Sequence, residues 1–210
     1  MLQTKGRLLH NPILYDLTVW LFTGGKESAL RQKVADIANL HVGEAVLDIG
    51  CGTGSQAIAV KRRVGSVGSV IGLDASDEML AGARAKARKQ GVDITFTHGV
   101  AERLPFADAH FDLVLSIVML HHLPHKSRME CLTEVRRVLK PDGRVLVVDF
   151  EGTADQSKGI AASFNRHKHG FVAADHLASD IEESGLAVHR RGKMGISDLH
   201  FTIAAPKVGI

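Results

Sequence analysis

AVLDIGCGTGSQAIAV, residues 45–60, is the stretch that decides the fold. A short run of apolar and β-branched residues, a turn rich in glycine and a helical pattern from Ser55 follow one another there. Further along the chain, short β-branched runs keep alternating with longer helical patterns, which is typical of βαβ units and a parallel sheet. The predicted strands are residues 45–49, 69–75, 94–99, 111–117 and 144–150. The sequence therefore predicts an α/β fold.

The segments between these strands carry helix start and stop signals. Ser76 is expected to cap a helix whose first turn holds Asp77 and Glu78, because acidic side chains favour the positive end of the helix dipole. A helix over about 126–139 is expected to be stopped by the sequence Pro-Asp-Gly at 141–143 before the next strand begins. Beyond residue 173 the pattern predicts a helix over 174–184 and closing strands over 187–194 and 199–206.

The length of 210 residues suits one domain with a single core. We expect residues 1–44 to form a helical cap or lid, 45–150 a cofactor-binding core, and 151–210 a variable segment with the closing strands. The stretch 13–22 is only ten residues long and contains Asp16, so neither a signal peptide nor a membrane span is expected. It is better explained as an amphipathic helix on a domain surface.

Charge and cysteine content exclude several classes of protein. The formal net charge is +3 and the basic pairs are scattered, so no nucleic-acid partner is expected. Cys51 and Cys131 are the only cysteines, which excludes a disulfide framework and a four-cysteine metal site. A reducing, cytoplasmic location fits this composition, and no metal is predicted. The sequence does not indicate an oligomeric state.

The glycine turn favours one kind of nucleoside ligand. A dinucleotide site would need glycines at 50, 52 and 55, but position 55 is Ser and the observed spacing is Gly-x-Gly-x-Gly over Gly50, Gly52 and Gly54. Asp48 precedes the turn, where a carboxylate would repel a pyrophosphate but attract an ammonium group. The methionine part of S-adenosylmethionine carries such a group, so the sequence predicts this methyl donor as cofactor.

Four segments of the sequence resemble a known protein family. VLDIGCGTG (46–54), IGLDASDEML (71–80), GVAERLPFADAHFDLVLSIVMLHHL (99–123) and RRVLKPDGRVLVVDF (136–150) together resemble class I S-adenosylmethionine-dependent methyltransferases, most of all the group that includes the ubiquinone and menaquinone C-methyltransferases. The resemblance implies a Rossmann-like, doubly wound sheet of seven strands, mostly parallel with the last strand antiparallel. It also implies an enzyme that methylates oxygen, nitrogen or carbon of a small molecule.

The resemblance further implies cofactor contacts for individual residues. Asp48 would face the methionine ammonium, Asp74 would bind the ribose, and the Ser116 backbone would lie near the methionine moiety. The remaining contacts implied for the cofactor fall on Gly50, Cys51, Gly52, Thr53 and Gly54 in the turn, on Ala75 and Met79 beside adenine, and on Val100, Ala101 and Glu102 at its far edge.

Two departures from the family pattern are visible. Where relatives often have an acid or amide that accepts from the adenine amino group, this chain has Val100, so adenine is expected to bind more weakly or through other groups. The carboxy-terminal signature of the quinone enzymes has Gly, Glu and Ser where this chain has Asp142, Asp149 and Glu151. The general family is therefore predicted without the quinone assignment.

The acceptor side leaves several alternatives open. His121 and His122 follow the fourth predicted strand, where either of them would act as a base or merely pack in the loop. Two functions compete with small-molecule methylation: an RNA or protein methyltransferase, and a non-catalytic module that binds S-adenosylmethionine. The residues outside the matched core that we associate with a lid over the acceptor are Tyr15, Trp20, Phe164, His167, His169 and Phe171.

Overall fold

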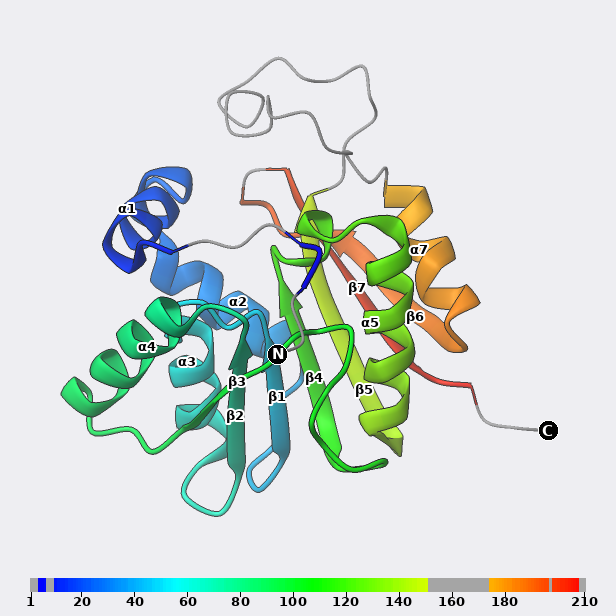
Figure 1. Ribbon diagram of the computed structural model, residues 1–210, viewed down its shortest axis with the longest axis horizontal. Coiled ribbons are helices and arrows are strands. Elements are labelled where there is room, and N and C mark those ends of the chain that lie inside the picture. Colours follow the sequence, from blue (N-terminus) through cyan, green and yellow to red (C-terminus); the bar gives the residue numbers. More distant parts are fainter. Residues whose placement is uncertain (1–3, 7–9, 151–173, 197, 208–210) are drawn as a thin grey trace.

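Seven strands form one sheet in the computed structural model, which describes residues 4–6, 10–150, 174–196 and 198–207 (Figure 1). Their order across the sheet is β3-β2-β1-β4-β5-β7-β6. Only β7 runs antiparallel to its neighbours β5 and β6, while the other described pairs are parallel. The predicted doubly wound sheet with an antiparallel closing strand is confirmed. The strands are β1 (Ala45–Ile49), β2 (Ser69–Asp74), β3 (Thr95–His98), β4 (Phe111–Ile117), β5 (Leu139–Phe150), β6 (Leu186–Lys193) and β7 (Leu199–Pro206).

Helices cover both faces of the sheet (Figure 1). One apolar layer joins α2, α3 and α4 to the sheet, and a second layer joins α5 and α7 to the opposite face. Neighbouring residues of β1 divide between these layers, Val46 in the first and Leu47 in the second, as the period of two in a strand requires. The helices are α1 (Pro12–Phe22), α2 (Glu27–Ile37), α3 (Ser55–Val64), α4 (Asp77–Lys89), the 3₁₀ turn η1 (Leu120–His122), α5 (His125–Val138) and α7 (Ala174–Glu183).

The helix boundaries follow from side-chain caps. The Ser76 hydroxyl accepts a hydrogen bond from the Met79 N–H at 3.3 Å at the start of α4, as predicted. The Asn11 side chain accepts from the Leu14 N–H at 2.9 Å at the start of α1. Gly91, with φ +63°, follows the end of α4 and Gly185, with φ +87°, follows α7, because glycine adopts the left-handed conformation without strain.

The prediction for residues 141–143 was wrong. Instead of separating helix from strand, this Pro-Asp-Gly sequence lies within β5, which begins at Leu139. Leu139 pairs with Phe111, the register then shifts, and Arg144 pairs with Leu113. A Cβ atom on Gly143 would lie 2.9 Å from the Phe111 carbonyl oxygen, so glycine lets this irregular segment lie directly against β4.

Two further observations bear on the predictions. The segment 151–173, with Phe164, His167, His169 and Phe171, lies outside the described residues. Within the described part of the chain, no helix has the length and apolar character that crossing a bilayer requires.

Candidate functional site

The glycine turn connects β1 to α3 at the carboxyl edge of the sheet. Gly50, Gly52 and Gly54 all have positive φ, at +68°, +53° and +76°. The Gly50 N–H donates to the Leu73 carbonyl at 2.8 Å, and the Gly52 N–H donates to the Asp74 carboxylate at 2.8 Å. The turn is thus fixed to the end of β2, and the three glycines are where the backbone requires them.

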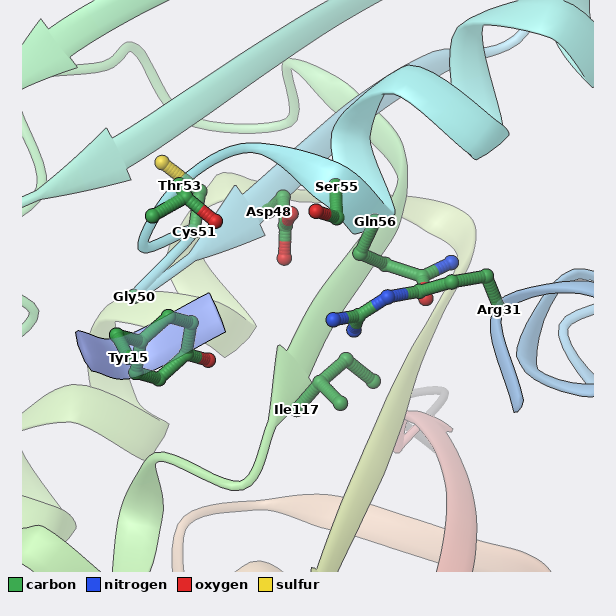
Figure 2. A pocket seen from close by; sticks show the side chains of 9 residues that line it. All are labelled: Tyr15, Arg31, Asp48, Gly50, Cys51, Thr53, Ser55, Gln56 and Ile117. Atoms are coloured by element: carbon green, nitrogen blue, oxygen red, sulfur yellow. The ribbon is translucent and has the colours of Figure 1, made fainter. Parts of the chain in front are cut away.

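A pocket opens beside this turn, and its most buried charged group is Asp48. This residue lies in β1 with 2% of its surface exposed. Burial raises the pKa of the Asp48 carboxyl to about 7, with the Asp74 carboxylate adding to the rise, while Arg31 and the backbone N–H of Ala57 oppose it. The lining residues are Tyr15, Arg31, Asp48, Gly50, Cys51, Thr53, Ser55, Gln56 and Ile117 (Figure 2).

Three pocket side chains hold buried polar atoms that lack a hydrogen-bond partner among the described residues. These atoms are Oδ2 of Asp48, Nε of Arg31, and both Oε1 and Nε2 of Gln56. Figure 2 shows the Arg31 guanidinium, with Gln56 beside it, directed toward the Asp48 carboxylate. Since buried polar groups are ordinarily paired, the cluster fits a ligand that brings both a donor and an acceptor. An amino-acid end with its ammonium on Asp48 and its carboxylate on Arg31 and Gln56 satisfies it.

Tyr15 from α1 closes the other side of this pocket. Its ring lies against the turn, because a Cβ atom on Gly52 would be 3.3 Å from Tyr15 Cε1. Burial raises the pKa of the Tyr15 hydroxyl, Arg31 opposes this effect, and the carboxylates of Asp48, Asp74 and Asp16 add to it. We had associated Tyr15 with a lid over the acceptor, and the structure places it in the wall of the pocket that contains Asp48.

A polar network fastens α1 over the turn. The Thr53 hydroxyl donates to Asp16 Oδ1 at 2.6 Å, and Lys86 Nζ from α4 donates to Asp16 Oδ2 at 2.9 Å. The same ammonium donates to the hydroxyls of Thr53 at 2.9 Å and Ser55 at 2.8 Å. These hydrogen bonds connect α1, the turn and α4 to one another. The network fixes α1, which carries Tyr15, against the turn.

Asp74 stands at the end of β2, next to the turn. Its carboxylate accepts from the N–H groups of Gly52 at 2.8 Å and Ser76 at 2.9 Å, while burial raises its pKa against these hydrogen bonds. The carboxylate can accept a further hydrogen bond, as from a ribose hydroxyl. Ala75 is half-buried beside it and Met79 is buried in the first turn of α4. The ribose and adenine roles stay predictions.

The remaining predicted cofactor residues lie at the ends of β3 and β4. Val100 and Ala101 are buried, and Glu102 accepts from the Thr4 hydroxyl at 2.8 Å. Ser116 is buried beside Ile49 of β1, and its hydroxyl has no partner in the described part of the chain. All the predicted residues thus gather along the carboxyl ends of β1 to β4, where ligands bind in such sheets. Their individual contacts stay predictions.

The histidines that follow β4 have partners of their own. His121 Nδ1 lies 2.7 Å from Asp149 Oδ1, and His125 Nε2 lies 3.1 Å from Asp180 Oδ1. His122 packs its ring on that of His121, with centroids 3.9 Å apart. Within the residues described, no group of three histidine, cysteine or acidic side chains is arranged to hold a metal ion.

Four lining residues of the pocket were not predicted as cofactor residues: Arg31, Ser55, Gln56 and Ile117. Gln56 had a weak signal, since an amide on the buried face of an amphipathic helix needs a partner. Arg31 had none, because its i,i+4 pairing with Glu27 resembles an ordinary surface ion pair. Only the packing of α2 on α3 brings the Arg31 guanidinium to Asp48.

Comparisons with known proteins identify the family to which this chain is similar. A family model described as a methyltransferase domain matches residues 46–143. Over 172 residues the chain is 37% identical to a ubiquinone/menaquinone biosynthesis C-methyltransferase from Pseudomonas putida, and the match covers 80% of this chain and 66% of that relative. The chain thus spans about two thirds of the length of this relative.

Solved structures share the fold. A SAM-dependent methyltransferase from Aquifex aeolicus superposes with a TM-score of 0.72 at 21% identity, over 92% of this chain and 97% of the other. The cyclase SpnF superposes with a TM-score of 0.71 at 21% identity, over 87% and 82%. At these identities the likeness concerns the fold alone.

The fold defines a Rossmann-like protein, and the pocket beside Asp48 has the unpaired polar groups that an amino-acid end would complement. The matched family model and the P. putida relative identify the family. The chain belongs to the S-adenosylmethionine-dependent methyltransferases. The predictions of the family, of the enzyme class and of the cofactor are confirmed.

Proposed function

We propose that this chain transfers the methyl group of S-adenosylmethionine to a small molecule, at a carbon or oxygen atom that loses a proton in the reaction. The observation that supports this most is the cluster of unpaired buried atoms on Asp48, Arg31 and Gln56. It complements the charged end of the methionine moiety, so Asp48, Arg31 and Gln56 would hold that end of the methyl donor.

The identity of the acceptor rests on the relatives. The Pseudomonas putida protein is named for C-methylation in ubiquinone and menaquinone biosynthesis, which favours a quinol-type ring as acceptor here as well. The match covers 66% of the length of that relative, so we do not assign acceptor contacts to individual residues of this chain from the relative. A quinol also carries the ionisable hydroxyl that makes its ring carbon, or the oxygen itself, nucleophilic.

The residues of the chain have mainly positioning tasks in this reaction. When bound, S-adenosylmethionine supplies an electrophilic methyl group on a sulfonium. Asp48, Arg31 and Gln56 hold the amino-acid end, and Tyr15 with α1 covers the turn and limits the access of water. Because the charge of the sulfonium disappears during transfer, alignment of donor and acceptor is the principal requirement.

A radiochemical assay tests the proposal. The protein is incubated with S-adenosylmethionine labelled in the methyl group and with 1,4-naphthohydroquinone, catechol, benzylamine or mixed RNA in separate reactions. We expect label in the naphthohydroquinone or catechol product. Label in RNA alone would favour a nucleic-acid methyltransferase, and cofactor binding without label in any product would favour a non-catalytic module.

Arg31→Leu is expected to raise the Kd for S-adenosylmethionine about 10- to 100-fold. The variant loses charge-assisted hydrogen bonds to the methionine carboxylate, each of which contributes about 1.5–3 kcal/mol. Isothermal titration calorimetry measures the change. Arg63→Leu is the matched control, because Arg63 forms an exposed ion pair with Asp36 on the surface. Equal affinities for the two variants would remove Arg31 from the cofactor site.

Cofactor affinity is expected to depend on pH below neutrality. The pKa of Asp48 is about 7 in the free protein, and the ammonium group of the ligand favours the ionised carboxylate. Binding below that pH therefore requires loss of a proton, so affinity should fall up to about tenfold for each pH unit below 7. Calorimetry between roughly pH 5.5 and 7.5 measures this slope. A flat profile, or the same slope in Asp48→Asn, would contradict the assignment.

A further inference from the structure

A histidine and a buried aspartate form a hydrogen-bonded pair at the carboxyl edge of β4 and β5. His121 Nδ1 lies 2.7 Å from Asp149 Oδ1, and the His121 backbone N–H donates to Asp149 Oδ2 at 3.2 Å. The Phe150 N–H donates to Asp149 Oδ1 at 2.8 Å. Only 3% of the Asp149 side chain is exposed. Both carboxylate oxygens are thus held by groups that donate to them.

This geometry determines which nitrogen of His121 carries hydrogen. With two backbone N–H groups donating to it, the Asp149 carboxylate acts as an acceptor, so Nδ1 of His121 is the protonated nitrogen. Nε2 of the neutral ring then holds a free lone pair. Among the described residues no group hydrogen-bonds to this atom, and 16% of the side chain is exposed.

Neighbouring rings hold the imidazole in one orientation. The His122 ring lies at a centroid distance of 3.9 Å, and Phe150 makes an edge contact at 5.3 Å. A fixed ring with an accessible lone pair is the arrangement that a general base requires.

The same short segment reaches the cofactor turn. Val118, which follows β4, has φ +54°, a strained conformation for a β-branched residue, and its N–H donates to the Val148 carbonyl at 2.7 Å. The next residue, Met119, lies over the turn, because a Cβ atom on Gly50 would be 2.5 Å from Met119 Cγ. The segment that carries His121 therefore borders the methyl-donor site.

We propose that His121, oriented by Asp149, is the general base for methyl transfer. This inference rests on the proposed function and narrows the acceptor to a phenolic hydroxyl or an activated ring carbon. The acceptor O–H bond breaks and its proton moves to Nε2. In O-methylation the freed electron pair on oxygen bonds the methyl carbon. In C-methylation that pair forms a C=O bond, a ring π pair bonds the methyl carbon, and the proton on that ring carbon is then lost to water as the ring regains its aromaticity. In both cases the electrons of the S–CH₃ bond stay on sulfur in a neutral thioether. Asp149 stabilises the imidazolium until the proton passes to water.

Nuclear magnetic resonance of the protein labelled with ¹⁵N-histidine tests the pair without any acceptor. His121→Gln identifies the His121 signal by its loss. We expect that signal to show hydrogen on Nδ1 in the wild type, and Asp149→Ala to shift it toward a mixture of the Nδ1–H and Nε2–H forms, because no carboxylate then accepts from Nδ1. Hydrogen on Nε2 in the wild type, or an unchanged signal in Asp149→Ala, would overturn the proposal.

Kinetics with two acceptor classes tests the catalytic role. His121→Gln and Asp149→Asn are expected to lower turnover of 1,4-naphthohydroquinone or catechol by about 10²- to 10⁴-fold, the usual contribution of a general base. S-adenosylmethionine affinity should not change, which also shows that the variants fold. The control His125→Gln removes a histidine of another His–Asp pair, 66% exposed, and should retain full turnover.

The two levels of the proposal fail in different ways. Full turnover of a hydroxyl acceptor by His121→Gln would overturn the base and leave the methyltransferase assignment intact. If the wild type methylates benzylamine but no hydroxyl or carbon acceptor, the acceptor class named here is wrong and the proposal is overturned. Absence of methylation of any acceptor would count against the proposed function, and the resonance experiment would still decide the state of His121.

Discussion

Asp48→Asn is expected to weaken S-adenosylmethionine binding by about 100-fold, the largest loss of affinity that we predict for a single substitution. The carboxylate is buried, and its Oδ2 has no partner within the described chain. It therefore gives the ligand ammonium a strong, weakly screened attraction that a neutral amide does not replace. Calorimetry measures the loss, and Asp36→Asn, at an exposed position on α2, is the control.

The same substitution should not destabilise the free protein. Asp48 has its ordinary pKa of 3.8 in the unfolded chain and a pKa of about 7 in the folded protein, so the folded state binds more protons between these values. The contribution of Asp48 to the free energy of unfolding consequently falls as pH rises from about 4 to about 7. Urea unfolding at pH 8 should show Asp48→Asn at least as stable as the wild type. A large loss of stability there would mean that the carboxylate serves the fold.

Gly54→Ala is expected to lower the free energy of unfolding by about 2–4 kcal/mol. Gly54 has φ +76° at the start of α3, a conformation that costs alanine about 1–2 kcal/mol. The added Cβ would also lie 2.9 Å from Phe96 Cζ and 3.0 Å from Ala83 Cβ. The cost of this steric clash adds to the cost of the backbone strain, because β3, α4 and the turn pack against one another at this position. Chemical denaturation of the wild type and the variant measures the difference.

Gly91→Ala separates strain from clash. Gly91 has φ +63°, but no atom lies within 4 Å of the position of its Cβ. This control should lose only the conformational part, about 1–2 kcal/mol. If both variants lose the same amount, Gly54 is required for its dihedral angle alone and the packing explanation is wrong.

Local patterns were sufficient to predict most of the fold. Alternating β-branched runs located β1, β4 and β7 to the residue, because a strand pattern bounded by turn residues leaves little freedom in register. The helix cap at Ser76 followed from its hydroxyl. The Pro-Asp-Gly segment at 141–143 misled us, since a turn signal does not reveal that Leu139 already pairs with Phe111.

The site was predictable only where neighbouring residues build it. Asp48 and the glycines lie in one motif, so their spacing indicated the cofactor. Arg31 reaches the pocket because α2 packs on α3, and Asp149 meets His121 because β4 pairs with β5. Such contacts join residues far apart in the sequence, and no local period encodes them.

Calorimetry with two ligands tests the central claim most directly. S-adenosylmethionine and 5′-methylthioadenosine share the nucleoside, but the second lacks the amino-acid end that Asp48, Arg31 and Gln56 are proposed to bind. We predict that the wild type binds S-adenosylmethionine at one site per chain and binds 5′-methylthioadenosine at least about 100-fold more weakly. Equal affinity for the two ligands, or no binding of S-adenosylmethionine at millimolar concentration, would contradict the account.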